Sequence, residues 1–241
     1  MREPVAARIC RPGAITLDAR CGGCVVRASV ESGPLPSTGL EQVLQRSQRF
    51  ALPARRTLYW QGNPAEALYA LRCGAVKLLR KEPGGELRLV RLVKAGIAIG
   101  LETVFREPYR HTAVAIEPLE YCRIPTGVLR HMESAGRAFY EALTRQWQAH
   151  LDEADSIAGS FGAGRAEQRL ARLLLKLGAM QQGQHCVSLL RSDLGSLLGV
   201  SKETASRLMA DFHRRGVIRG ARRQLECECD VARLRAIADG R

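Results

Sequence analysis

The sequence predicts an α+β protein that consists of a β domain, one long helix and a C-terminal helical domain with a β wing. Three observations predict this order. Short apolar runs broken by glycine-containing turns fill residues 50–125, a helical apolar period begins at Thr126, and two short helices joined by a tight turn lie within residues 191–212. We therefore divide the chain into an N-terminal arm, a β roll, a long helix and a C-terminal domain, at residues 1–38, 39–125, 126–161 and 162–241.

The chain is strongly basic. It has 37 Lys+Arg against 24 Asp+Glu, and its formal net charge is +13. Residues 162–241 hold 15 of the basic and 8 of the acidic residues. A basic balance favours a polyanionic partner such as nucleic acid, through counterion release. An Arg-rich proteome would spread positive charge in the same way, so charge supports this interpretation without deciding it.

Two further features bear on the compartment. No apolar run approaches the roughly 20 residues that span a bilayer. The first 30 residues contain five arginines and no long apolar core, which argues against a signal peptide. We therefore expect a cytoplasmic protein with no membrane partner. In a reducing compartment, the eight cysteines are expected to be thiols or metal ligands and not structural disulfides.

The pattern of residues 50–125 is typical of a small antiparallel barrel or jelly roll. Short strand candidates recur at regular spacing, with glycines between them. Pro83-Gly84-Gly85 is a favourable hairpin turn. The predicted strands are residues 68–71, 75–79, 87–93, 113–116 and 121–124.

The next segment, from Thr126 to about residue 159, has the period of a helix. Because a single long helix beside a completed β domain has nothing in cis to cover an apolar seam, we interpret residues 126–161 as the coiled-coil helix of a homodimer. A helix packed wholly on its own β domain is the alternative. Trp147 and Leu151 lie beside the stripe, whose members are Phe139, Leu143, Gln146, His150, Ala154, Ile157 and Phe161.

The two short helices within residues 191–212 have well-defined ends. Gly199 suits the positive-φ residue that ends the first helix, and Ser201 suits the N-cap of the second. On the second helix Glu203, Ser206 and Arg207 share one face, one turn apart. The opposite face is apolar and consists of Ala205, Leu208, Met209 and Phe212.

An apolar back with an Arg/Glu/Ser front fits the recognition helix of a helix-turn-helix. In that setting Arg207 would reach a guanine edge, and Glu203 would accept a hydrogen bond from a cytosine amino group. The alternative is an ordinary amphipathic hairpin, because exposed Arg and Glu are usually only solvated. Residues 217–229 are interpreted as a β wing, so the C-terminal domain is predicted to be a winged helix-turn-helix that binds double-stranded DNA.

This order resembles that of the CRP/FNR superfamily of bacterial transcription regulators, from about Leu40 to the C-terminus. The resemblance implies a β roll like the cyclic-nucleotide-binding jelly roll, a dimer helix and a partner RNA polymerase. By the FNR-type pattern, Glu203, Ser206 and Arg207 would read a TTGAT-like half-site of an inverted repeat, and Lys202 would contact a phosphate or flanking base. The matching segments are Leu68-Tyr-Ala-Leu-Arg-Cys-Gly-Ala-Val-Lys77, Ala166-Glu-Gln-Arg-Leu170, Arg191-Ser-Asp-Leu-Gly195 and Glu203-Thr-Ala-Ser-Arg207.

The cyclic-nucleotide contacts of that family are not matched. Members that bind cyclic AMP resemble one another in a Gly-Glu-Leu-Gly turn and an Arg-Ser/Thr-Ala phosphate cradle. Here the turn is Gly96-Ile-Ala-Ile-Gly100, without an acid for a ribose hydroxyl. The cradle is Arg110-His-Thr-Ala113, with His111 where the phosphate-binding arginine would stand. We expect no cyclic nucleotide as a ligand.

The cysteines resemble those of FNR-type oxygen sensors, which hold an iron–sulfur cluster with three cysteines of the arm and one of the β roll. Cys21 and Cys24 match two arm ligands, and Cys122, just before Ile-Pro, matches the fourth. The expected third arm cysteine is Val30 here. The resemblance therefore implies Cys10, Cys21, Cys24 and Cys122 as ligands of a [4Fe–4S] cluster, with Cys10 reaching the site through a flexible arm. A free thiol at Cys10 is the alternative.

The mechanism that this resemblance implies is a redox switch, in which oxygen or nitric oxide destroys the cluster and releases the dimer. Three competing interpretations keep the architecture: a haem or nitric oxide sensor, a thiol–disulfide switch of Cys21 and Cys24 without metal, and a DNA-binding protein with a vestigial sensor. An enzyme is not expected, because the five histidines are scattered and none lies in a recognisable catalytic motif.

Overall fold

The computed structural model describes residues 48–133, 137–162, 164–180, 185–187, 189–220 and 226–240. The predicted arm, with Cys10, Cys21 and Cys24, lies outside these residues. The chain divides into two compact units, and each is considered by itself. The first extends to Leu151 without Gly85–Arg91, and the second holds Gly85–Arg91 and the chain from Asp152 onward.

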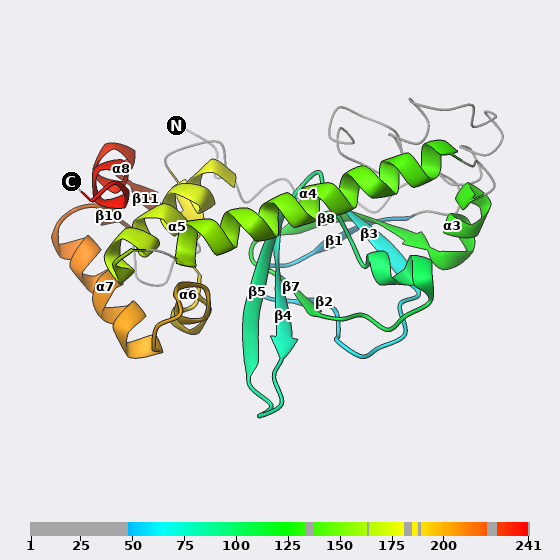
Figure 1. The fold of residues 1–241 in the computed structure, drawn as a ribbon, viewed down its shortest axis with the longest axis horizontal. Helices are drawn as coiled ribbons and strands as arrows, with labels where there is room; N and C mark the ends of the chain where they lie inside the picture. The colour runs from blue at the N-terminus through cyan, green and yellow to red at the C-terminus, as the bar shows by residue number, and fades with distance from the viewer. Residues whose placement is uncertain are drawn as a thin grey trace. The chain divides into compact units, whose positions relative to one another are not determined.

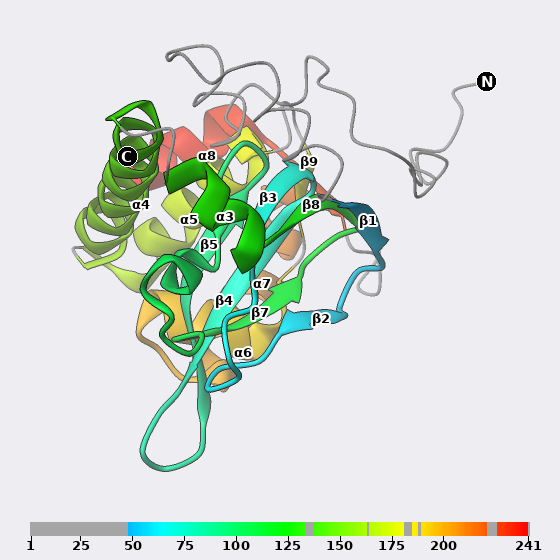
Figure 2. The same ribbon diagram turned by 90° about the vertical axis from the view of Figure 1, so that its right-hand side faces the viewer.

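The first unit is the predicted jelly roll. One antiparallel sheet has the order β1-β8-β3-β6 and a second has the order β2-β7-β4-β5; β3, β8 and β1 lie side by side in Figure 2. A 3₁₀ helix, η3 (Leu101–Phe105), follows β6. Prediction missed the short strands β1, β2 and β6, because so few residues show little alternation of apolar and polar side chains. The strands are β1 (Gln48–Leu52), β2 (Thr57–Tyr59), β3 (Ala67–Cys73), β4 (Ala75–Lys81), β5 (Leu87–Lys94), β6 (Ala98–Ile99), β7 (Thr112–Ala115) and β8 (Leu119–Pro125).

Tyrosines fill part of the interior of the roll. The ring centroids of Tyr59 and Tyr109 lie 4.0 Å apart, and those of Tyr59 and Tyr69 lie 5.4 Å apart. The Tyr109 hydroxyl donates a hydrogen bond to the carbonyl of Ala67 at 2.8 Å. Burial is the main reason why the pKa of Tyr109 is raised far above its usual value. Gly100 has a φ of 79°, and a Cβ there would lie 3.1 Å from a carbon of the Tyr109 ring.

Two helices follow the roll where one was predicted. They are α3 (Thr126–Glu133) and α4 (Arg137–Gly162). The Ala98 N–H donates to Gln146 Oε1 of α4 at 3.1 Å, and Nε2 of buried His150 lies 2.7 Å from the Ala98 carbonyl oxygen. The predicted partner-facing stripe is therefore wrong at Gln146 and His150, which face β6 of their own chain. The physical reason is that β6 is a sheet edge, whose outward backbone groups need hydrogen-bond partners.

Another face of α4 carries large apolar side chains that stay exposed. Trp147 is 40% exposed and Leu151 is 55% exposed. The Trp147 ring stacks on the ring of Phe105 in η3, with centroids 5.3 Å apart, and Phe105 is itself 57% exposed. We call Phe105, Trp147 and Leu151 the α4 patch. Trp147 and Leu151 each follow Gln146 and His150 by one residue, so they lie on the neighbouring face of α4.

The second unit is a winged helix-turn-helix, as predicted. Its three-stranded antiparallel sheet has the order β10-β11-β9, and the helices α5 to α8 are labelled in Figure 1. Prediction missed α8, although Asp230 caps it by accepting the Arg233 N–H at 3.0 Å and Leu234 and Ile237 are buried. The elements are α5 (Ala166–Met180), β9 (His185–Val187), α6 (Arg191–Leu198), α7 (Lys202–Arg214), β10 (Ile218–Arg219), β11 (Glu226–Cys229) and α8 (Val231–Ala238).

Within the part of the chain that the structure describes, every helix is too short or too polar to cross a bilayer.

Candidate DNA-contacting surface and sensor cysteine

The turn between α6 and α7 depends on two glycines. Gly199 ends α6 with a φ of 60°, as the sequence predicts. Gly195 is buried and its carbonyl accepts the Val200 N–H at 3.0 Å, and a Cβ at Gly195 would lie 2.8 Å from the Val200 carbonyl oxygen. The close approach of α6 and the start of α7 therefore needs glycine at this position, which explains the Arg191-Ser-Asp-Leu-Gly195 segment.

The start of α7 is capped as predicted. Ser201 has an extended backbone, and its hydroxyl accepts the Thr204 N–H at 3.1 Å. Ala205, Met209 and Phe212 are buried on the inner face of the helix, and Leu208 is half-buried. The four predicted DNA-contacting residues, Lys202, Glu203, Ser206 and Arg207, are all exposed on the first two turns. The structure thus brings the whole predicted set onto one accessible surface.

Charge and hydrogen bonding organise that surface. The pKa of Glu203 is lowered, first because its carboxylate accepts its own backbone N–H and next because it accepts the Ser201 hydroxyl. Glu203 is therefore an ionised acceptor at neutral pH. Arg207 Nη2 lies 3.4 Å from Thr204 Oγ1, to which it donates. Sequence analysis did not single out Thr204, although its spacing of three residues before Arg207 places the two one turn apart.

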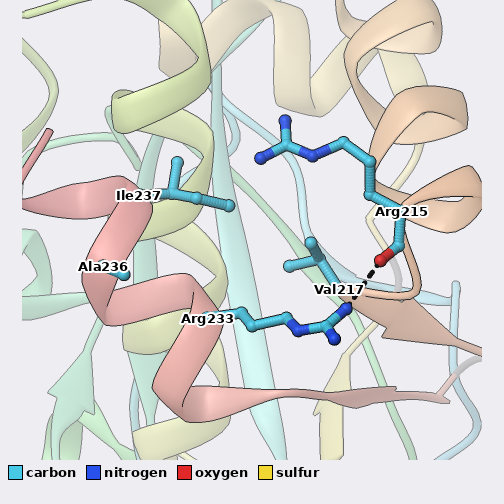
Figure 3. A pocket seen from close by; sticks show the side chains of 5 residues that line it. All are labelled: Arg215, Val217, Arg233, Ala236 and Ile237. Atoms are coloured by element: carbon cyan, nitrogen blue, oxygen red, sulfur yellow. Dashed lines mark hydrogen bonds between the residues drawn. The ribbon is translucent and has the colours of Figure 1, made fainter. Parts of the chain in front are cut away.

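The far end of α7 is fixed by arginines. Arg215 pairs with Glu167 of α5 and with Asp211 of α7, and Arg233 Nη1 of α8 donates to the Arg215 carbonyl at 2.8 Å. A pocket of about 420 Å³ lies here, with Val217 and Ile237 among its lining residues; Figure 3 shows Arg233 directed to the Arg215 carbonyl beside it. These contacts hold α7 against α5 and α8, so the exposed residues of α7 project from a fixed helix.

Cys122 lies in the first unit, in the middle of β8. Its Cα pairs with Arg49 on β1 and with Ala70 on β3, and its side chain is 5% exposed. Arg72 Nη1 donates to Cys122 Sγ at 4.0 Å. Two residues before Cys122, Glu120 accepts a hydrogen bond from Arg49 Nη2 at 3.0 Å. The sulfur is therefore buried beside charged groups. Sequence analysis missed Arg72, although an arginine within the apolar run of β3 was a signal.

The other cysteines are placed differently. Cys10, Cys21 and Cys24 fall outside the described residues, so their predicted convergence on Cys122 stays a prediction. Cys73 is exposed at the end of β3. Cys229 is disulfide-bonded, which corrects the expectation that all the cysteines are thiols or metal ligands. Within the described ranges, no three His, Cys, Asp or Glu side chains form a metal site.

Both units match known domain families. Residues 49–134 match the cyclic nucleotide-binding domain, and residues 168–237 match the Crp-like helix-turn-helix domain, in the same order along the chain. The chain belongs to the CRP/FNR family of transcription regulators. This CRP/FNR regulator is a DNA-binding protein, and its matched domains and relatives are transcription regulators and not enzymes.

Its relatives within the family are mixed. The chain is 25% identical to the transcriptional regulatory protein Btr of Bordetella pertussis, over 86% of this chain and 88% of that protein. It is 24% identical to the transcriptional activator protein Anr of Pseudomonas aeruginosa, over 83% of this chain and 84% of that protein. It is also 29% identical to the cyclic AMP receptor protein of Thermus thermophilus, over 75% of this chain and 83% of that protein.

Solved structures show the same fold. A CRP-family transcriptional regulator from Thermus thermophilus superposes with a TM-score of 0.66 at 24% identity, covering 79% of this chain and 96% of that one. FixK2 from Bradyrhizobium japonicum superposes with a TM-score of 0.64 at 22% identity, covering 78% of this chain and 96% of that one. At these identities the likeness supports the fold and not a particular signal.

Proposed function

We propose that this CRP/FNR regulator binds an inverted-repeat, TTGAT-like promoter site as a dimer and senses oxygen or redox state through a [4Fe–4S] cluster. The observation that carries the DNA-binding part is the exposed set Lys202, Glu203, Ser206 and Arg207 on a capped, clamped helix. Arg207 is proposed to donate to a guanine edge, Glu203 to accept from a cytosine amino group, and Lys202 to contact phosphate.

The sensor proposal is supported by the setting of Cys122. Thiolates are the usual ligands of iron–sulfur clusters, and an N–H donor directed at the sulfur suits the negative charge of such a centre. The buried Cys122, with Arg72 at 4.0 Å, fits this requirement. Cys10, Cys21 and Cys24 are the proposed remaining ligands. Relatives of this chain include proteins named anaerobic regulatory protein, from Pasteurella multocida and Haemophilus influenzae.

The proposed switch depends on a connection between the N-terminal arm and β8. Three arm cysteines and Cys122 would tie the arm to β8, and this tie would favour the DNA-binding dimer. When bound, the cluster would supply the reactivity toward oxygen or nitric oxide on which this switch depends. Loss of the tie would then shift the population away from the dimer, because only a difference in free energy between the two states can move it.

We propose no cyclic nucleotide ligand for this chain. The residues on either side of His111 make contacts within the protein. The hydroxyl of buried Thr112 accepts the Gln61 N–H at 3.0 Å, and Arg110 pairs with Glu107. The segment from Gly96 to Gly100 provides no carboxylate for a ribose.

The dimer is proposed to form through the α4 patch. A second copy of this chain is the occupant that fits, because Trp147 and Leu151 repeat at the spacing of a helical seam and remain exposed in one chain. Gln146 and His150 are excluded from the seam by their bonds to Ala98. RNA polymerase is the proposed protein partner of the DNA-bound dimer.

Anaerobic purification tests the sensor. Iron, acid-labile sulfide and a broad violet-blue absorption that bleaches in air are the expected results. Colourless protein without iron or sulfide would end the cluster proposal. Two alternatives are tested in the same spectrum, because Val30 stands where the third arm cysteine is expected. A sharp Soret band would indicate haem. The absence of both absorptions would indicate a thiol–disulfide switch of Cys21 and Cys24.

A further inference from the structure

The strand that carries Arg72 is irregular at that residue. In the pairing of β3 with β8, Leu71 lies opposite Tyr121 and Cys73 lies opposite Glu120, so the register shifts and Arg72 is the extra residue. Such bulges redirect a side chain relative to its neighbours on the strand. Here the redirected guanidinium of Arg72 reaches the sulfur of Cys122. Cys122 pairs across the sheet with Ala70, which precedes Arg72 by two residues on β3.

The burial of this contact gives it weight. Arg72 is 6% exposed and Glu120 is 4% exposed. Burial of a guanidinium is unfavourable unless hydrogen bonds and opposite charge compensate for it, so an arginine at this place needs a structural or functional reason. The Arg49–Glu120 pair lies on the same face of β8 as Cys122. The contact of Arg72 with Cys122 places an N–H donor at the sulfur, beside that ion pair.

We propose that Arg72 is a positioning residue for the cluster ligand Cys122. Its Nη1–H fixes the orientation of Sγ and donates to the ligating thiolate. This inference rests on the cluster proposed above. Hydrogen bonds to ligand sulfurs and to the groups around them set the stability and potential of such centres, so Arg72 controls how long the cluster survives in air.

The test uses the full chain, reconstituted anaerobically with iron and sulfide. Arg72→Met removes the donor and the charge, and Arg72→Lys keeps a cationic donor. Arg123→Met is the matched control, because Arg123 follows Cys122 directly, points to the other face of β8 and pairs with Glu66 at 3.7 Å. Iron and sulfide per chain are measured first, and then the rate at which the visible absorption bleaches in air.

We expect Arg72→Met to bleach about 10- to 100-fold faster than wild type, or to hold correspondingly less iron. Arg72→Lys restores most of the difference, and Arg123→Met behaves as wild type. Resonance Raman spectroscopy gives a readout that a merely structural role would not move: one iron–sulfur stretch shifts in D₂O in the wild type, and this shift is absent in Arg72→Met. Where the methionine variant does not fold, Arg72→Leu, which also has no donor, replaces it.

The outcomes separate the two proposals. Wild-type protein that takes up no cluster overturns both. In a second outcome the wild type takes up a cluster, and Arg72→Met has an unchanged bleaching rate and an unchanged isotope shift. That outcome overturns the role of Arg72 and leaves the sensor proposal in place. Equal acceleration by Arg123→Met also overturns the role, because it would show a general loosening of the roll.

Discussion

The recognition helix α7 and the strand β8 carry the two halves of the proposed function in opposite ways. On α7, Lys202, Glu203, Ser206 and Arg207 come from one helix, lie within two turns and face solvent. On β8, the setting of Cys122 is assembled from three strands and is buried. The exposed face of α7 follows from the helical period of a few neighbouring residues. The surroundings of Cys122 depend instead on which strands pair and in which register.

The largest expected effect is on the β8 side. Cys122→Ser removes a proposed ligand, so reconstituted protein is expected to hold no [4Fe–4S] cluster, as measured by iron, sulfide and absorption. Cys73→Ser is the control, because Cys73 is exposed on the neighbouring strand. A full cluster in Cys122→Ser would contradict the ligand assignment.

The second effect concerns the α4 patch, which has the spacing of a helical seam and is proposed to contact a second copy of the chain. Leu151→Glu places a charge in the proposed seam and removes apolar burial of about 1.5–3 kcal/mol from each copy. We expect monomers in sedimentation experiments at concentrations where the wild type dimerises. Leu190→Glu is the control, because Leu190 is 54% exposed against 55% for Leu151. A dimer of unchanged affinity in Leu151→Glu would place the interface elsewhere.

The third effect tests the α7 side. Arg207→Ala is expected to weaken binding to the specific site by about 1–3 kcal/mol and to leave binding to unrelated DNA nearly unchanged. Lys202→Ala is expected to weaken both kinds of DNA alike and to lower the salt dependence, because a phosphate contact carries no sequence information. Fluorescence anisotropy with both DNAs measures the ratio. An unchanged ratio in Arg207→Ala would refute its base contact.

A smaller effect is expected at the cap of α7. Ser201→Ala removes the acceptor of the Thr204 N–H and should lower the free energy of unfolding by about 1 kcal/mol. Urea denaturation followed by circular dichroism measures it. Ser196→Ala is the comparison that should change stability less, because the Ser196 hydroxyl lies within α6 and donates to the Ser192 carbonyl, which is one turn earlier in the same helix.

The smallest effect is a pH dependence. Because the pKa of Glu203 is lowered by its own backbone N–H and by the Ser201 hydroxyl, the carboxylate stays ionised as the pH falls below the usual range for glutamate. Its contribution to site-specific binding is lost only as the pH falls through that lowered value. In Ser201→Ala the loss should occur at higher pH, and in Glu203→Gln it should be absent. Loss at the same pH in wild type and Ser201→Ala would contradict this hydrogen bond.

Prediction from sequence was accurate where neighbours in the chain decide the structure. The Gly199 turn, the Ser201 cap and the two faces of α7 are all confirmed. It was wrong at Gln146 and His150, since their partner Ala98 lies about 50 residues away and a helical period cannot show which stripe covers a sheet edge. Arg72 escaped notice for the same reason, because its contact with Cys122 depends on a bulge in the pairing of β3 with β8.

Local sequence was sufficient to predict the order of domains and the two faces of α7, because side-chain period, caps and turn residues act over a few positions. Cys122 was singled out only by its resemblance to the β-roll ligand of FNR-type proteins. Long-range packing settled which face of α4 stays exposed and which charged groups surround Cys122. Those outcomes follow from satisfying buried backbone and charged groups between distant segments, a condition that no short stretch of sequence contains.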